Sequence, residues 1–215
     1  DGSAAQAGHV RVYKWSGSAW GQLGADIDGE AINDSFGYRV DLNADGTIVA
    51  VGAHYHDGAP GTDSGHARVF QWTDGSWTQL GANIDGESAS DHAGGGVALS
   101  ADGTVLALGG SHNDANGASD SGHVRVFHWA DGTWSKVATV EGEAADDWFG
   151  YSVALSADGG RLAAGARFND DSGTDAGAAY VYELDGRVGG KTSPDLADIS
   201  VWIDGTEYKA TGGGG

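Results

Sequence analysis

Carboxylate and amide side chains recur at regular intervals in two kinds of segment that could supply oxygen ligands to a divalent cation. In the first kind, acids lie at alternate positions, so their side chains leave an extended loop on the same side. Ca²⁺ takes six to eight oxygen ligands, which such a loop can offer. The acids of the first segment are Asp26, Asp28, Glu30 and Asp34, and the counterparts are Asn83, Asp85, Glu87 and Asp91, then Thr139, Glu141, Glu143 and Asp147. The alternative is a solvated loop whose acids accept hydrogen bonds from backbone amides, because the glycine lies elsewhere than in a usual calcium loop.

A second and denser group of Asp and Asn residues lies in three long loops. A calcium site is more strongly indicated in these loops than in the first segments, because the oxygen ligands are closer together. Ordinary turns are the alternative, since Asp, Asn and Gly also dominate turns. The candidate ligands are Asp57, Asp63, Asn113, Asp114, Asn116, Asp120, Asn169, Asp170, Asp171 and Asp175.

Three histidines, His9, His66 and His123, recur in step with each other. A catalytic group is needed once, whereas a structural hydrogen bond is needed in every repeat, so the pattern predicts a structural role. His54 and His56 lie two residues apart and could form half of a zinc site. No third ligand is evident nearby in the sequence, so an exposed pair at a strand end is the favoured interpretation.

The sequence predicts that the chain is not an enzyme. It contains no nucleophile elbow, phosphate loop, metalloprotease motif or dinucleotide fingerprint. Pairs of acids, which a glycosidase would need, recur in every repeat. This repetition indicates that the acids have a structural role in the scaffold. Asn33 begins an acceptor sequon for N-linked glycans, Asn-Asp-Ser.

Tryptophan is abundant, and six of the eight residues are periodic. We expect the periodic ones to pack between repeats. Trp148 and Trp202 lie outside the repeat. Exposed aromatic rings beside acids and amides can stack on sugar rings, so a lectin is one of the functions considered. The periodic residues are Trp15, Trp20, Trp72, Trp77, Trp129 and Trp134.

The composition excludes several classes of partner. With 31 acidic and 11 basic residues the formal net charge is −20, which repels phosphate backbones and anionic lipids. There is no cysteine, so disulfides and thiolate metal sites are excluded, and no apolar run is long enough to span a membrane. We expect an extracellular or cell-surface protein with no nucleic-acid partner and no membrane insertion.

The elements that position these residues come from an internal repeat. The motif Gly-His-Val-Arg-Val-Tyr-Lys-Trp begins at Gly8 and returns in similar form at Gly65, Gly122 and Gly177. The steps are 57, 57 and 55 residues, obtained by subtracting these positions. A fixed step of this size is typical of propeller or solenoid architectures. Other residues in the same phase are Trp20, Trp77 and Trp134, and Asp45, Asp102 and Asp158.

Each unit predicts four short β-strands. In the third unit the alternating segments are 124–129, 134–140, 149–155 and 161–166, and Asp131-Gly132 marks a hairpin turn. The last of these segments, 161–166, is rich in Ala and Gly, which fits a crowded strand near a common axis. Four antiparallel strands in a fixed-period unit predict propeller-type blades, in an all-β fold of about three and a half repeats.

The motif Phe-Gly-Tyr-x-Val followed by x-Gly-Ala resembles FG-GAP repeats, the blades of integrin α-subunit propellers. It occurs at residues 36–40 with 51–53 and at 149–153 with 164–166, and in weaker form at 93–97 with 108–110. The resemblance covers residues 8–184. It implies a β-propeller with adhesion or ligand-binding roles, often with bound calcium.

Two features depart from that family. Its calcium loop is replaced by short turns around Asp45, Asp102 and Asp158. Three and a half blades also do not close a ring of four to eight, so an incomplete ring or an open array is expected.

We divide the chain into FG-GAP-like blades at 1–184 and a C-terminal segment at 185–215 with a β-hairpin and a Gly-rich end. The favoured function is a non-catalytic surface or matrix protein that mediates adhesion through protein or glycan ligands at its loops. The first alternative is a filament subunit completed by blade or strand exchange between copies, through self-association or as part of a longer chain. A carbohydrate-binding lectin is the second alternative.

Overall fold

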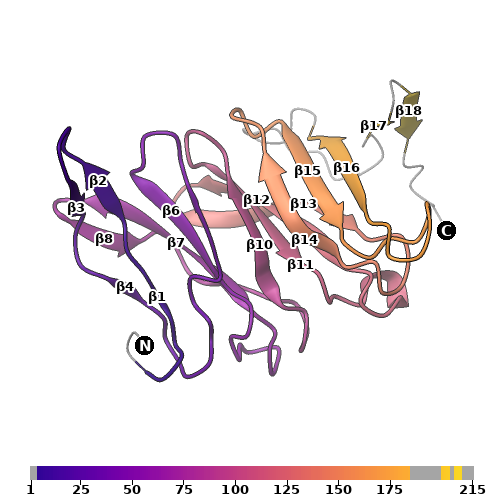
Figure 1. Ribbon diagram of the computed structural model, residues 1–215, viewed down its shortest axis with the longest axis horizontal. Coiled ribbons are helices and arrows are strands. Elements are labelled where there is room, and N and C mark those ends of the chain that lie inside the picture. Colours follow the sequence, from indigo (N-terminus) through magenta and orange to yellow (C-terminus); the bar gives the residue numbers. More distant parts are fainter. Residues whose placement is uncertain (1–3, 185–199, 204–205, 210–215) are drawn as a thin grey trace.

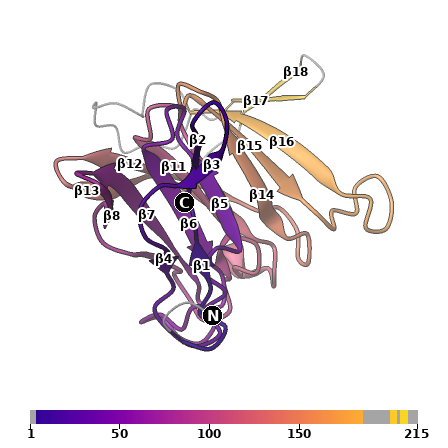
Figure 2. The same cartoon turned by 60° about the vertical axis from the view of Figure 1, so that its left-hand side comes forward.

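A computed structural model describes residues 4–184, 200–203 and 206–209, the last two ranges as backbone only. These residues form antiparallel β-sheets and one short 3₁₀ turn, η1 (Ala115–Gly117), which confirms the all-β prediction. Figures 1 and 2 show the sheets side by side in chain order, in an open row rather than a closed ring. No helix in the described part of the chain is long and apolar enough to cross a membrane.

Four groups of strands make up the row. Sheet I consists of two pairs, β1 (His9–Val10) with β4 (Ile27–Asp28) and β2 (Tyr13–Trp15) with β3 (Trp20–Gln22). Sheet II contains β5 (Arg39–Leu42), β6 (Ile48–Ala53), β7 (His66–Thr73), β8 (Ser76–Gln79) and β9 (Ile84–Asp85). Sheet III contains β10 (Ala93–Leu99), β11 (Val105–Gly110), β12 (His123–Ala130) and β13 (Thr133–Glu141). Sheet IV contains β14 (Phe149–Leu155), β15 (Arg161–Ala166), β16 (Ala178–Glu183), β17 (Ser200–Ile203) and β18 (Thr206–Lys209).

The sheets do not coincide with the sequence units. In the third unit, 124–129 and 134–140 lie in sheet III, whereas 149–155 and 161–166 lie in sheet IV. Sheets II, III and IV therefore each take their first two strands from one period and their remaining strands from the next, whereas all strands of sheet I belong to the first period. A periodic pattern fixes the step but not the point at which one sheet ends.

The predicted C-terminal hairpin is present. β17 and β18 pair from Ser200 with Lys209 to Ile203 with Thr206, and β17 joins β16 through Tyr182 and Val201. The hairpin thus extends sheet IV. Its turn at 204–205 and the Gly-rich end lie outside the described residues.

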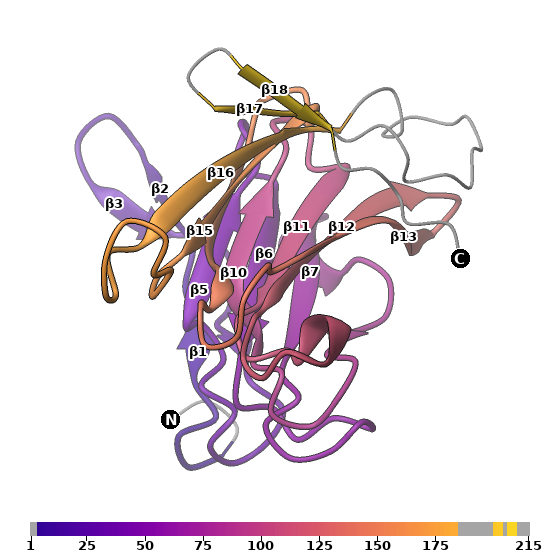
Figure 3. The same ribbon diagram turned by 90° about the vertical axis from the view of Figure 1, so that its right-hand side faces the viewer.

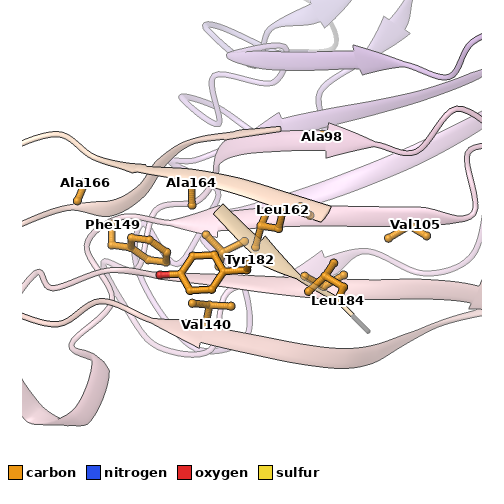
Figure 4. Packing of buried hydrophobic residues seen from close by; sticks show 12 residues of the cluster. Ala98, Val105, Val140, Phe149, Leu162, Ala164, Ala166, Tyr182 and Leu184 are labelled. Carbon is orange, nitrogen blue, oxygen red and sulfur yellow. The ribbon is translucent and has the colours of Figure 1, made fainter. Parts of the chain in front are cut away.

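Apolar side chains fill the spaces between neighbouring sheets. Between sheets II and III, Val97 and Leu99 of β10 pack against Ile48 and Val69. Between sheets III and IV, Phe149 and Leu162 belong to one buried cluster with Val124 of β12 and Val140 of β13. Figure 4 shows Phe149, Leu162 and Val140 in this cluster. A smaller cluster around Phe36 and Phe70 joins sheets I and II. The core is therefore divided among the interfaces, as expected of a repeat protein.

Glycine makes the closest contacts between sheets. A Cβ atom on Gly52 of β6 would lie 2.1 Å from the carbonyl oxygen of Gly94, and one on Gly109 of β11 would lie 2.0 Å from that of Gly150. No side chain fits in so small a space. The small residues of this strand are thus crowded, as predicted, and the crowding comes from the first strand of the next sheet.

The glycine that opens each Gly-His motif makes a second contact of this kind. Gly122 forms a parallel bridge to Phe149, and a Cβ atom there would lie 2.1 Å from the Phe149 carbonyl oxygen. Gly8 and Gly65 meet Phe36 and Ala93 in the same way. The Gly-His motif and the Phe-Gly motif therefore repeat in step with each other, because they touch at each interface between two sheets.

The periodic tryptophans form three pairs. The second and third pairs pack between repeats, as predicted, whereas Trp15 and Trp20 of the first pair are 49% and 67% exposed. Trp72 and Trp77 lie with ring centroids 5.3 Å apart against Gly24 of the preceding sheet. Trp77 Nε1 donates to the Leu23 carbonyl at 2.8 Å, and Trp134 repeats this bond to Leu80 at 2.9 Å. The strands that carry Trp77 and Trp134, β8 and β13, are thereby linked to the preceding sheet, just as the first and second strands are linked through glycine.

The histidines of the Gly-His motifs are buried in sheets II and III. His66 and His123 have 0% and 1% exposure, and neither Nε2 atom has a hydrogen-bond partner among the described residues. The carboxylates nearest to their Nδ1 atoms are Asp85 and Glu87, at 4.0 and 3.9 Å. The structural position was predicted, but the expected hydrogen bond is not formed.

We expect Gly109→Ala to destabilise the protein by about 1–3 kcal/mol, because the methyl group has to push two sheets apart. Gly165→Ala at the matching position of sheet IV is the control. Its Cβ atom would meet only the end of the Ser152 side chain, at 2.9 Å. Urea unfolding of both variants measures the difference. Equal destabilisation would contradict the assigned contact.

Stability should decrease as the pH falls from about 6.5 to about 4. Burial, with Arg125 as a second cause, lowers the pKa of His123 to about 4, whereas an unfolded histidine titrates near 6.5. Over this window the unfolded chain binds a proton that the folded chain does not, which costs about 1.4 kcal/mol per pH unit. Urea unfolding in EDTA at pH 7, 6 and 5 measures the slope. The slope should fall by this amount in His123→Asn, and an unchanged slope would refute the assignment.

Candidate functional site

The first and second strands of each sheet meet at one end of the molecule, here called the loop end. Because these strands are antiparallel, the start of β10 lies beside the end of β11 (Ala93 with Gly110). β14 and β15 repeat this arrangement, with Phe149 beside Ala166. The long loops that follow the second strands also begin here, and η1 marks one of them in the lower part of Figure 3.

A buried aspartate fastens each loop. Asp91 accepts a bond from Asn113 Nδ2 at 3.0 Å and further bonds from the backbone amides of Glu87 and Ser88. Asp147 accepts from Asn169 Nδ2 at 2.8 Å. In the first repeat, Asp34 is paired with His56 Nδ1 at 3.0 Å. These carboxylates are at most 4% exposed. They hold the segment before each first strand against the loop after the second.

Aromatic and imidazole rings form an unbroken row across the loop end of sheets II, III and IV. Neighbouring centroids are 3.8 Å apart from Tyr38 to His54 and 5.9 Å from His54 to His92. They are 4.2 Å apart from His92 to His112 and 4.3 Å from His112 to Trp148. The aromatic row consists of Tyr38, His54, Tyr55, His92, His112, Trp148, Tyr151 and Phe168.

Polar groups accompany the row without interrupting it. The guanidinium of Arg39 lies 4.5 Å from the Tyr38 ring centroid and 6.0 Å from that of Tyr151. Arg167 lies 5.0 Å from Tyr151 and 4.8 Å from Phe168. Tyr38 and Tyr55 are 40% and 44% exposed. The exposed part of the row therefore consists of two tyrosine rings, and the other rings are half-buried except His54, which is buried.

The two central imidazoles are neutral at pH 7. Burial lowers the pKa of His92 and His112 below the usual histidine value. Their Nδ1 atoms lie 3.1 Å apart, so one donates and the other accepts. His112 is also paired with Ser111 Oγ at 3.0 Å.

Sequence reasoning missed the row because its side chains change from repeat to repeat. Trp148 follows Asp147 as His92 follows Asp91 and Ser35 follows Asp34, so its backbone position is periodic although its ring is not. The three residues share a positive φ of 53–56°. That shared conformation, next to each buried aspartate, is the signal that connects them.

Three acids of the first calcium segment have separate hydrogen-bond partners, and the fourth, Asp28, lies in strand β4. Arg11 holds Asp26 through two nitrogens at 2.7–3.0 Å, which lowers the Asp26 pKa to about 2. Asp28 is paired in register with His9, and Asp34 accepts from the Ala31 amide at 3.0 Å. Glu30 accepts from Asn83 Nδ2 at 3.0 Å. Asn33 is exposed in the same segment.

In the second calcium set, one aspartate closes each loop on itself. Asp57 accepts from the Asp63 amide at 2.9 Å, and Asp114 accepts from the Asp120 amide at 3.0 Å. Asp170 accepts from the amide of Asp175. The other candidate ligands, Asn116 and Asp171, are exposed in these loops, whereas Asn113 and Asn169 face the buried aspartates. Calcium binding at either set stays a prediction.

The structure separates the predicted histidine pair. His54 lies in the aromatic row, whereas His56 stacks on His66 with centroids 3.9 Å apart. Glu30 lies beside them, and one potential ligand atom from each of Glu30, His56 and His66 falls within 4.8 Å of the others. Among the described residues this is the one such group of three. The third ligand not evident in the sequence comes from a distant segment.

The face of sheet IV that is turned away from sheet III is hollowed. A depression of about 510 Å³ is lined by Tyr151, Ser152, Gly165 and Arg167, together with residues 177–179. Gly165 is the counterpart of Gly52 and Gly109, onto which the next sheet packs. The depression therefore lies on the face of sheet IV that corresponds to the faces of sheets II and III onto which the next sheet packs.

Residues 25–70 and 134–182 match the FG-GAP repeat family. A comparison with curated proteins gives no significant match.

Among solved structures, the chain is similar to β-propeller proteins. A putative 6-phosphogluconolactonase from Bacteroides uniformis is 15% identical (TM-score 0.54), over 81% of this chain and 44% of that one. A second, from Bacteroides fragilis, is 16% identical (TM-score 0.53), over 85% and 41%. A functionally unknown protein from Desulfotomaculum acetoxidans is 12% identical (TM-score 0.51), over 92% and 48%. The chain spans less than half the length of each, and the likeness concerns the fold alone.

Proposed function

We propose that this FG-GAP repeat protein is a non-catalytic binding module of an extracellular surface or matrix protein, and that its loop end binds a glycan. The observation that carries the proposal is the aromatic row. Eight rings from three sheets are continuous there, with neighbouring centroids 3.8–6.3 Å apart. A chain of sugar rings is the class of ligand that matches a long strip of aromatic faces.

The chemistry of the strip suits a saccharide. Tyr and Trp offer large flat surfaces at a small cost in side-chain entropy, and their polar atoms stay available for hydrogen bonds. Arg39 and Arg167 provide guanidinium donors over the rings of Tyr38 and Tyr151. Hydroxyl groups of a sugar can accept these bonds while the apolar face of the sugar lies on the rings.

Two buried acids beside the strip support a role without catalysis. Asp91 and Asp147 are buried and accept bonds from Asn113 and Asn169, so they serve to hold the loops. A general acid or base has to reach a substrate atom at about 2.6–3.2 Å. Carboxylates that are already saturated by loop amides are poorly suited to that task.

A second candidate function is a filament subunit, and the two end faces of the row of sheets favour it. At one end, Val40 and Leu42 of β5 are 52% and 46% exposed, whereas their counterparts Val97 and Leu99 are 8% and 7% exposed against sheet II. At the other end lies the hollow beside Gly165. Each face is half of the interface that already joins sheets II, III and IV, so copies of the chain can stack end to end.

The glycan proposal predicts retention of the protein on a glycan array and loss of affinity when the row is interrupted. Trp148→Ala should weaken binding at least tenfold, since alanine removes a central stacking face. Trp15→Ala in the β2–β3 hairpin is the matched control, because Trp15 is exposed but lies outside the row. Titration of the best glycan by calorimetry gives the affinities. Equal loss in both variants, or no retained glycan, would refute the proposal.

The filament candidate predicts assembly that increases with protein concentration. Leu42→Glu should abolish it, because a charge would be buried at the contact. Light scattering in calcium and in EDTA measures the mass. A monomer under all conditions would exclude the filament and leave the glycan proposal untouched.

A further inference from the structure

The least explained buried group in the described structure is the imidazole of His66. Its exposure is 0%, yet neither ring nitrogen has a hydrogen-bond partner. A buried polar group left without a partner costs about 1–3 kcal/mol. The ring lies against His56 and close to Glu30, so the missing partner has to fit among these three residues.

We propose that His56, His66 and Glu30 bind one Zn²⁺ ion, or a similar divalent transition metal, at the junction of sheets I and II. Two imidazoles and a carboxylate whose ligand atoms lie within 4.8 Å of one another form the donor set. Three protein ligands leave a fourth position for water or another ligand. The site is distinct from the second set of calcium candidates, and it shares Glu30 with the first set.

His56 is already oriented as a metal ligand. Its Nδ1 atom lies 3.0 Å from Asp34 Oδ2, and Asp34 is 1% exposed. A carboxylate accepts hydrogen bonds, so Nδ1 carries the proton and the lone pair of the ring is on Nε2. Metal-binding histidines commonly donate their other nitrogen to a carboxylate in this way.

Glu30 can turn toward the two histidines without leaving the charged guanidinium of Arg68 unpaired. Its oxygens contact Asn83 Nδ2 at 3.0 Å and Arg68 at 3.6 Å. Arg68 keeps its bonds to Gln79 Oε1 at 2.9 and 3.0 Å and to the Asp28 carbonyl at 3.2 Å. The guanidinium therefore stays partnered when Glu30 moves.

The ligand types indicate zinc rather than calcium. Imidazole suits Zn²⁺ and other transition metals, whereas Ca²⁺ prefers oxygen ligands alone. Asp34 and Asp85 add negative charge close by, with Asp85 4.0 Å from His66 Nδ1. Together with Glu30 they outnumber the single cationic neighbour, Arg68.

The repeat provides an internal comparison. The counterparts of the three ligands are Glu87, Asn113 and His123 at the next junction, where asparagine replaces the first histidine. Asn113 keeps the bond to its buried aspartate, at 3.0 Å. His56→Asn therefore reproduces a residue that the fold already tolerates at this position, and it removes one ligand.

A metal at this site would connect the segment between β4 and β5 to β7 and to the loop after β6. Sheet I has short strands and the smallest core, so it gains most from such a link. A ligand bound only by the folded state raises stability in proportion to the logarithm of its concentration over Kd. This inference does not depend on glycan binding.

The test uses the full chain, stripped with EDTA and dialysed. Titration with ZnCl₂ should show one equivalent bound, an increase in melting temperature, and no competition from a tenfold excess of CaCl₂. Co²⁺ in place of zinc should give visible absorption bands from a site of low coordination number.

His56→Asn and Glu30→Gln should each weaken zinc binding at least tenfold while the protein stays folded by circular dichroism. His112→Asn is the control, because His112 pairs with His92 in the aromatic row and not with this group. A chain that binds no zinc, or that binds it equally in His56→Asn, would overturn the proposal. Loss of binding in His112→Asn alone would place the metal in the aromatic row and would overturn it too.

Discussion

The close approach of one sheet to the next, made possible by glycine, is the constraint on which the rest of the structure depends. Gly52 against Gly94 and Gly109 against Gly150 bring a second strand and the following first strand to backbone contact. Such a contact leaves one arrangement of the two sheets, because a shift along the strand would place a side chain where none fits. The apolar clusters and the tryptophan pairs then fill the space that this arrangement defines.

The loop end follows from the same constraint. The buried aspartates fasten the segments before β10 and β14 to the loops of their own sheets. Because the sheets are held in register, these segments also reach the loop of the preceding repeat, where the backbone amides of His92 and Trp148 donate to the carbonyls of Asp63 and Asp120. The rings that continue the row from one sheet to the next are carried by those segments. A rigid scaffold that positions variable side chains is the usual basis of a binding surface. The periodic part of the sequence thus builds the scaffold, and the aperiodic part gives it its individual chemistry.

The histidines illustrate both roles. His123 lies under its sheet as a packed, neutral ring, and a Cβ atom on Gly110 would lie only 2.9 Å from its Nε2 atom. His66 has the same place in the repeat but meets His56, which replaces an asparagine of the other repeats. One substitution on a repeated scaffold is enough to bring two imidazoles together.

The sequence alone determined the strands, the 57-residue step and the Asp-Gly hairpins, because each depends on local alternation, turn chemistry or repetition. It also pointed to crowding around the Ala- and Gly-rich strands. Only the tertiary structure decided where one sheet ends and the next begins, since the length of a repeat does not define the residue at which each structural unit starts. It alone placed Trp148 beside His112 and Glu30 beside His56 and His66, because these contacts join residues 26–36 positions apart whose approach is set by packing. Local pattern governs the elements, whereas contacts between sheets govern the sites.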